Sequence, residues 1–258
     1  MNILTVDIGN TNTVFGLYCE DSLAGVLRIK TELNLSVADY SAKISAFIRS
    51  TDIGGSHVSG AVLMSVVPDL NVPVGRALQS IIEVEPFVVS HEIDTGIKIC
   101  YEDPVQVGLD RVVNAVGAFV KYRQSVIVVD MGTATTFDYV SDSGEFMGGA
   151  ISPGLRISAE ALFEKTSLLP RVALKAPDRT VCRDTVSNIQ SGIIFGYAGL
   201  VDTMVNRMIK ETGRHPRVIA TGGLSSLVYP YCEALQVMDE YLTHFGLKTI
   251  FERQVQAT

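Results

Sequence analysis

The chain has 258 residues, a length that fits one large domain or two small ones. Hydrophobic residues make up 47% of it and charged residues 19%, which is a globular composition and argues against long disordered segments. The formal net charge of -7 leaves no basic footprint for nucleic acid or an anionic membrane, so we expect neither as a partner. A small anionic ligand remains compatible, since it needs only local positive groups.

The four cysteines and the apolar runs bear on the cellular compartment. The cysteines are scattered and form no CxxC pair, which argues against a zinc knuckle or a thioredoxin-like motif and suits a reducing cytoplasm. No apolar run approaches the roughly 18 residues of a membrane span. The amino terminus reaches Asp7 without a basic region and does not resemble a signal peptide. We therefore expect a soluble cytoplasmic protein.

The first part of the chain predicts strands and helices in alternation. Apolar, β-branched runs predict the strands, and a polar turn with glycine joins the first two. Ser36 is a candidate N-cap, and Pro68 ends a strand. Beyond Gly108, apolar residues at helical spacing predict a helix whose first turn carries Asp110 and Arg111. The other expected elements are strands over 2–7, 13–18, 57–67 and 85–90 and helices over 36–50 and 70–82.

The second part begins with the clearest strand of the chain, residues 125–130. A turn and a second strand follow within residues 131–140, and the segment GGAISPG at 148–154 predicts a glycine-rich loop. We further expect helices over 155–165, 187–210 and 224–235, and a strand over 217–223 that runs into a glycine turn.

An internal repeat is the most informative feature. Residues 3–17 and 126–140 each read as a buried strand that ends in aspartate, then one apolar residue, glycine, small polar residues and a second strand. The two aspartates, Asp7 and Asp130, lie about half the chain apart, which indicates two similar α/β halves. From the repeat alone we expect domains over 1–117 and 118–258.

Each of the two turns has the chemistry of a phosphate site. Glycine lets the backbone approach a ligand, and successive N–H groups with threonine hydroxyls form a nest for phosphate oxygens. The aspartate suits a metal ion, or the waters of one, beside the phosphate. A single copy could be an ordinary hairpin turn, but two matching copies argue against that. No Walker A loop or dinucleotide fingerprint is present, so a bound ATP would be held in another way.

Five motifs in order resemble the type III pantothenate kinase family. They are DIGNTNT at 7–13, YEDPVQVGLDR at 101–111, DMGTATT at 130–136, GGAISPG at 148–154 and DTVSNIQSG at 184–192, with ATGG at 220–223 beyond them. The two strand-turn-strand segments also look like the phosphate motifs of the actin, hexokinase and sugar-kinase superfamily. The resemblance implies an α/β fold of two similar actin-like, ribonuclease H-like halves, with mixed sheets flanked by helices and a cleft between them.

The resemblance also implies an activity and its cofactors. The expected reaction is ATP-dependent phosphorylation of pantothenate to 4'-phosphopantothenate, the first step of coenzyme A biosynthesis. Mg²⁺ would accompany ATP near Asp7, with water between them as one option, and a monovalent cation, K⁺ or NH₄⁺, would bind at Asp130. The residues expected to bind ATP are Val6, Asp7, Ile8, Gly9, Asn10, Thr11, Asn12, Thr13 and Thr133.

A second group of residues is expected to bind the acceptor. Gly108, Leu109, Asp110 and Arg111 match the GxDR motif of the family, and Tyr101 and Thr185 match its substrate contacts. Arg111 can hold a carboxylate through two parallel N–H bonds, while Asp110 can accept the proton of the attacking hydroxyl. The plainer alternatives are a helix-capping Asp-Arg pair, a packing tyrosine at 101 and an N-cap hydroxyl at 185.

The expected assembly, the remaining glycine motifs and the alternative functions follow from the same resemblance and residues. The resemblance implies a homodimer with the substrate site near the subunit interface. Gly222 and Gly223 could admit the adenine or ribose, and the loop at 148–154 would lie beside the nucleotide. A kinase for another hydroxy acid or a sugar is an alternative. A non-catalytic, nucleotide-binding regulatory protein on the same fold is another.

Overall fold

The computed structural model describes residues 1–51 and 58–257, so His57, where one predicted strand would begin, lies outside the described residues. The chain forms two compact units, each built from separate segments. Unit 1 comprises 1–97, 102–117 and 243–258, and unit 2 comprises 98–101 and 118–242. The units differ from the predicted domains at 98–101 and at the last sixteen residues, because neither segment carries a mark of the internal repeat.

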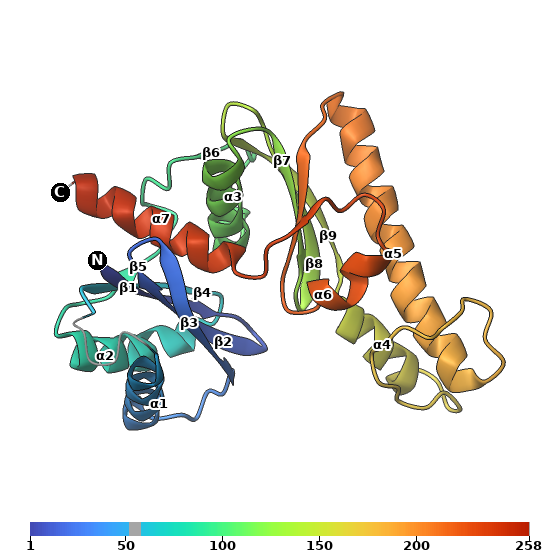
Figure 1. Cartoon of the computed structure of the whole chain (residues 1–258), viewed down its shortest axis with the longest axis horizontal. Helices are drawn as coiled ribbons and strands as arrows, with labels where there is room; N and C mark the ends of the chain where they lie inside the picture. Colours follow the sequence, from blue (N-terminus) through green and yellow to red (C-terminus); the bar gives the residue numbers. More distant parts are fainter. Residues whose placement is uncertain (52–57, 258) are drawn as a thin grey trace. The chain divides into compact units, whose positions relative to one another are not determined.

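Unit 1 is built on a five-stranded mixed sheet with the order β3-β2-β1-β4-β5 (Figure 1). The first three strands are antiparallel neighbours, whereas β4 and β5 run parallel to β1. The strands are β1 (Asn2–Ile8), β2 (Asn12–Cys19), β3 (Ser22–Lys30), β4 (Gly60–Ser65) and β5 (Phe87–Val88).

Helices pack against both faces of this sheet. Leu4, Val6 and Ile8 share one core with α1 (Val37–Ser50) and α2 (Asn71–Ile82), which lie side by side in Figure 1. The expected N-cap is confirmed, because the Ser36 hydroxyl accepts the Asp39 N–H in a capping box. Ile3, Val62 and Met64 form the core of the other face with α3 (Leu109–Tyr122) and α7 (Leu242–Ala257). Short 3₁₀ helices, η1 (Pro68–Leu70) and η2 (Pro104–Gln106), precede α2 and α3.

Unit 2 repeats the same topology, which confirms the fold predicted from the repeat. Its six-stranded sheet has the order β11-β10-β7-β8-β9-β6. Without β6 this matches unit 1, since β7, β8 and β9 are antiparallel neighbours and β10 and β11 run parallel to β7. Even the register irregularity recurs, between Leu17 and Tyr18 and between Tyr139 and Val140. The strands are β6 (Lys98–Ile99), β7 (Val126–Met131), β8 (Ala134–Val140), β9 (Glu145–Pro153), β10 (Arg217–Thr221) and β11 (Val237–Met238).

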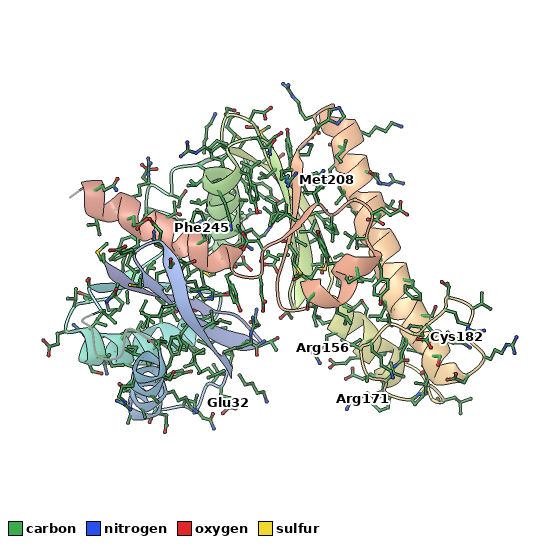
Figure 2. All side chains as sticks on the ribbon, viewed as in Figure 1. Glu32, Arg156, Arg171, Cys182, Met208 and Phe245 are labelled. Atoms are coloured by element: carbon green, nitrogen blue, oxygen red, sulfur yellow. The ribbon has the colours of Figure 1, made fainter. Side chains whose placement is uncertain are left out.

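One face of this second sheet packs against α5 (Thr185–Thr212), through Val129, Met131 and Ala220 on the strands and Ile194 and Val201 on the helix. The other helices are α4 (Leu155–Glu164), α6 (Ser225–Val228) and the 3₁₀ helix η3 (Tyr229–Tyr231). The long connection between α4 and α5 carries Arg171 and Cys182, which are labelled in Figure 2. Within the described residues, no helix is long and apolar enough to cross a membrane.

Two predicted elements of unit 2 are wrong. The segment 148–154 was expected to be a loop, but most of it belongs to β9. Its Gly149 serves close packing, because a Cβ there would lie 1.8 Å from the Phe137 carbonyl oxygen on β8. The helix expected over 224–235 ends after Val228, and η3 follows with a proline at its start.

His244 of α7 is a buried polar residue in the core of unit 1. Its side chain is 3% exposed, and its Nδ1 lies 2.8 Å from the Thr5 hydroxyl on β1. Burial, with a smaller contribution from the charge of Arg28, lowers the pKa of His244 to about 4. The imidazole is therefore neutral in the folded protein at neutral pH.

This burial predicts acid lability with a defined pH window. The unfolded chain binds the proton at about pH 6.5 and the folded chain only at about pH 4, so stability is full above the first value and falls as the pH drops toward the second. We expect a loss of about 3 kcal/mol over this range, measured by urea unfolding at a series of pH values. His244→Gln should flatten this part of the profile, and identical pH slopes for both proteins would contradict the assignment.

Candidate functional site

The first predicted turn is a tight hairpin between β1 and β2. The Gly9 N–H donates to the Asn12 carbonyl at 3.0 Å, which closes the turn. Thr31, the residue after β3, braces it. Its hydroxyl donates to the Gly9 carbonyl at 2.7 Å and its N–H donates to the Thr11 carbonyl at 3.0 Å. Asn10 and Thr11 are exposed, so the tip of this turn faces solvent.

Other residues predicted in this motif have buried side chains. Val6 and Ile8 belong to the core under the sheet, and Thr13 is fully buried with its hydroxyl 3.1 Å from the Thr31 hydroxyl. Asp7 is partly exposed and pairs with Met64, which puts its side chain on the sheet face that α3 covers. A role of Val6 and Ile8 in ATP binding would thus rest on their backbone.

The second turn lies between β7 and β8 and is tied down on several sides. The Gly132 N–H donates to the Ala134 carbonyl at 3.0 Å, and the Leu224 N–H donates to the Met131 carbonyl at 3.1 Å. A Cβ on Gly154 would lie 2.1 Å from the Thr133 carbonyl oxygen, so the start of α4 touches the backbone of the turn. The turn is held by packed backbone, which leaves little room for movement.

Tyr197 of α5 adds a side-chain contact below this turn. Its hydroxyl hydrogen-bonds with the buried Thr135 hydroxyl and donates to the Pro153 carbonyl at 3.3 Å. Burial raises the pKa of Tyr197, so the phenol stays protonated and can donate. One hydroxyl therefore connects α5, the second turn and the end of β9.

Removing this hydroxyl should loosen the turn. We expect Tyr197→Phe to lower the free energy of unfolding by about 1 kcal/mol, measured by urea denaturation, because the Thr135 hydroxyl loses its partner in a buried place. The matched control is Tyr231→Phe, which removes the hydroxyl of an exposed tyrosine and leaves its ring against Phe195. Equal stability changes in the two variants would contradict the bracing role of Tyr197.

Asp110 and Arg111 stand at the amino end of α3, as predicted. An Asp110 carboxylate oxygen accepts the Arg111 N–H at 2.9 Å, and Leu109 packs against the core of unit 1. A Cβ on Gly108 would lie 2.5 Å from that same carboxylate oxygen, so a larger residue at 108 would push the Asp110 side chain out of this position. Asp110 is partly exposed, whereas Arg111 is 6% exposed. The contact with the Arg111 N–H engages one oxygen of Asp110 and is compatible with a role toward a ligand.

Tyr101 and Thr185 lie in unit 2. The Tyr101 ring packs edge-on against Phe146 and stays 37% exposed. Thr185 begins α5, but Asp184 is the N-cap, because its carboxylate accepts the Ser187 N–H at 2.9 Å. The N-cap alternative for Thr185 is therefore wrong.

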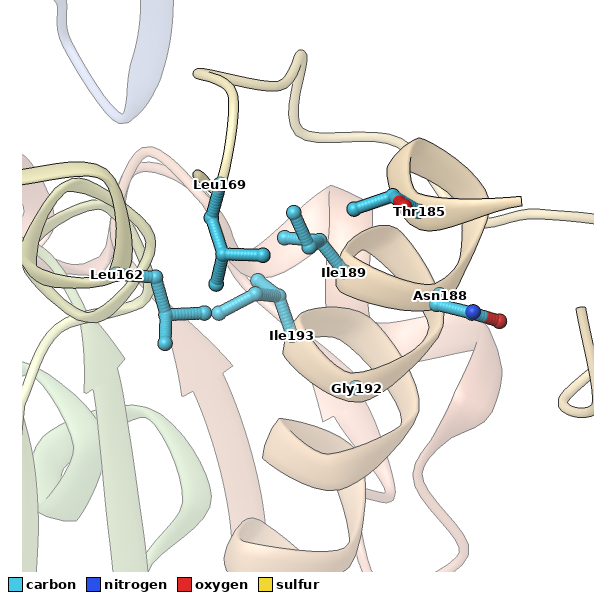
Figure 3. Close-up of a pocket in the computed structure, with 7 residues that line it drawn as sticks. All are labelled: Leu162, Leu169, Thr185, Asn188, Ile189, Gly192 and Ile193. Atoms are coloured by element: carbon cyan, nitrogen blue, oxygen red, sulfur yellow. The ribbon is translucent and has the colours of Figure 1, made fainter. Parts of the chain in front are cut away.

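Thr185 also stands at a pocket of about 450 Å³ beside α5. Leu162, Leu169, Ile189 and Ile193 converge on its floor in Figure 3, whereas the Asn188 side chain points away from them. The pocket is mainly apolar, with the threonine hydroxyl at its edge, so it suits an aliphatic group that carries a polar substituent.

The predicted residues fall into two sets. The first turn, Asp110 and Arg111 belong to unit 1, and the second turn, Tyr101 and Thr185 belong to unit 2. Sequence reasoning missed three supporting residues: Thr31, Tyr197 and Thr221. Thr221 had a signal, since it stands opposite Asp130 in the register and directly precedes the two glycines of ATGG.

Asp7 and Asp130 are the carboxylates at the two turns, and each could provide one protein ligand to a metal ion. In the described part of the chain, no group of three or more His, Cys, Asp or Glu side chains is placed to hold a metal. Mg²⁺ does not need one, because it keeps several waters and binds through one or two carboxylates plus substrate phosphates. Asp7 at the strand end fits that requirement. Asp130 lies against Gly222, where a Cβ would come within 2.3 Å of its carboxylate.

Comparison with known proteins agrees with the motifs. A family model described as type III pantothenate kinase matches residues 3–207. A type III pantothenate kinase of Syntrophobacter fumaroxidans is 45% identical over 252 residues, covering 97% of this chain and 98% of its own. One from Citrifermentans bemidjiense is 44% identical over 251 residues, covering 97% of this chain and 99% of its own.

A solved structure extends the comparison to the fold. The inorganic polyphosphate/ATP-glucomannokinase of an Arthrobacter species superimposes with a TM-score of 0.52 and 13% identity, covering 99% of both chains. At that identity the likeness concerns the fold alone, which is that of the actin-like sugar kinases. The family match covers most of the chain and the relatives cover nearly all of it. The chain therefore belongs to the type III pantothenate kinase family.

Proposed function

We propose that this kinase transfers the γ-phosphoryl group of ATP to the primary alcohol of pantothenate, giving 4'-phosphopantothenate for coenzyme A biosynthesis. The observation that carries the proposal is the duplicated strand-turn-strand unit, because the two strands of each copy are joined by a braced turn of glycine and hydroxyl residues. Backbone N–H groups held in that way can bind phosphate oxygens without reorganising. The family to which the chain belongs supplies the acceptor.

Asp110 and Arg111 would serve opposite ends of the acceptor. Neighbouring helical residues point about 100° apart, so the two side chains can reach different groups. The pantothenate carboxylate would accept two parallel N–H bonds from the buried Arg111. The pantothenate hydroxyl oxygen would bond to the γ-phosphorus as the bond from that phosphorus to the bridging oxygen breaks. ADP would leave, and the hydroxyl proton would pass to Asp110.

The two turns would bind the nucleotide. We infer that Gly9, Asn10 and Thr11 bind phosphate oxygens from the first turn and that Thr133 binds them from the second. Mg²⁺ near Asp7 would neutralise phosphate charge, and a monovalent cation, K⁺ or NH₄⁺, would bind at Asp130. Tyr101 and Thr185 would contact pantothenate, with the apolar pocket beside Thr185 available to its methyl groups.

The direct test is the acceptor dependence of ADP release. The protein is incubated with ATP and Mg²⁺, with K⁺ or Na⁺, and with pantothenate, other hydroxy acids or sugars. We expect ADP release and a phosphorylated product when pantothenate is the acceptor, and neither with the other acceptors. Stimulation by a different acceptor would transfer the activity to that substrate, and ATP binding without any stimulated turnover would favour the regulatory alternative.

We also propose a homodimer, formed through an apolar surface of unit 2. Gly192, Gly196 and Gly199 lie on one face of α5, and a Cβ on any of them would have open space before it, with no atom within 4 Å beyond the adjoining turns of the helix itself. Leu168, at 91% exposure, and Val181, at 81%, lie on the connection that leads to this helix. A second copy that covered this surface would remove those side chains from water.

Sedimentation and light scattering test the dimer. The native protein is expected at twice the chain mass, and Gly196→Glu should shift it to the monomer because a charge would be placed on the contact face. An unchanged mass for this variant would move the interface elsewhere. The four cysteines are all free, which suits the reducing cytoplasm that we propose as its compartment.

A further inference from the structure

The hydroxyl of Thr221 is a buried polar group without a hydrogen-bond partner among the described residues. The residue is 1% exposed and forms the last position of β10. Buried hydroxyls are normally paired, because desolvation without a partner costs free energy. Valine has nearly the same shape and would avoid this cost. The unpaired hydroxyl oxygen therefore points to a partner that binds there.

The sheet register places this hydroxyl beside Asp130. Thr221 pairs with Asp130 across the parallel β10 and β7 strands, so both side chains lie on the same face and on neighbouring strands. The Asp130 carboxylate also lies close to the end of β10, since a Cβ on Gly222 would lie 2.3 Å from one of its oxygens. On the other side of Asp130, the Thr136 hydroxyl is engaged, because it donates to Asp138 at 2.9 Å.

A cation suits this pair of oxygens better than an anion. The Asp130 carboxylate would repel a phosphate, whereas a hard cation accepts carboxylate and hydroxyl oxygens together. The described residues offer no cluster of three carboxylate, imidazole or thiolate groups here, which favours a single positive charge over a strongly chelated divalent ion. We propose that Thr221 is a second side-chain ligand, beside Asp130, of a monovalent cation. This inference rests on the cation of the proposed function and adds a residue to its site.

The test measures cation binding without nucleotide or pantothenate. ²⁰⁵Tl⁺ NMR and the K⁺-dependent shift of the melting temperature would be recorded at constant ionic strength with choline chloride. We expect Thr221→Val to weaken cation binding by roughly tenfold or more, since it removes one ligand. Thr221→Ser keeps the oxygen and should restore binding, and Asp130→Asn should abolish it.

Each contrary result has a distinct meaning. A Thr221→Val protein that binds Tl⁺ and K⁺ like the native one would overturn the inference. A native protein whose melting temperature and Tl⁺ signal show no specific cation effect would overturn it as well. Phosphorylation of pantothenate by the native protein is scored separately, so the kinase assignment stands or falls on another measurement. Circular dichroism of each variant shows whether the fold is intact.

Discussion

Asp110→Asn is expected to lower kcat for pantothenate phosphorylation by about 10²–10⁴-fold, because the amide cannot accept the hydroxyl proton. The substitution keeps an oxygen that can accept the Arg111 N–H, so the start of α3 should be preserved. ATP affinity should stay close to that of the native protein, since Asp110 is assigned to the acceptor. Steady-state kinetics and equilibrium ATP binding measure the two effects.

The matched control is Asp103→Asn, which changes a nearby aspartate that caps η2 through the Val105 N–H. We expect this variant to keep nearly full turnover. An Asp110→Asn enzyme with native kcat would remove Asp110 from the proton transfer. A loss of ATP affinity equal to the loss of kcat would instead assign it to nucleotide binding.

Gly154→Ala should strongly weaken ATP binding through the second turn. The added methyl carbon would lie 2.1 Å from the Thr133 carbonyl oxygen and 2.7 Å from that of Gly132, and both atoms belong to the backbone. The turn must shift to make room, at about 1–3 kcal/mol for an overpacked site. If the shift falls wholly on nucleotide binding, ATP affinity drops by roughly tenfold to a hundredfold. Isothermal titration with ATP and Mg²⁺ measures this.

Gly75→Ala provides the comparison within a helix. Its added carbon would meet only the Pro86 ring at 3.9 Å, an ordinary contact. We therefore expect native ATP affinity and a gain in stability of about 0.5–1 kcal/mol from helix propensity. If Gly154→Ala binds ATP as tightly as Gly75→Ala does, the second turn has no part in holding the nucleotide.

The duplicated architecture could be predicted because each copy contains a strand, an aspartate, a glycine and a second strand within one short, continuous segment. The third strand of each unit could not. Gly25 interrupts the apolar sequence pattern of β3, and Gly148 and Gly149 interrupt that of β9. Glycine within such a pattern indicates a turn when the sequence is read alone. Only the close approach of the neighbouring strand shows why glycine is needed at position 149.

The last helix escaped prediction for a related reason. Its inward positions include His244 and Lys248, so the apolar stripe is broken. Lys248 is nearly buried and bonds to Asp21 at 2.9 Å and to Glu252 at 2.7 Å. The proposed cation ligand Thr221 could not be predicted either. Strand pairing brings it beside Asp130, which lies 91 positions earlier, and local sequence does not determine the pairing of distant strands.

The discontinuous make-up of unit 1 has a consequence for biosynthesis. Residues 243–258 leave the ribosome after the whole of unit 2, yet α7 supplies part of the core under Ile3, Val62 and Met64. Unit 2 can therefore be synthesised and can fold before α7 exists. Until then the amino-terminal sheet lacks the part of its apolar cover that α7 provides. Chaperones that hold nascent chains would find their binding surface on that early-made half.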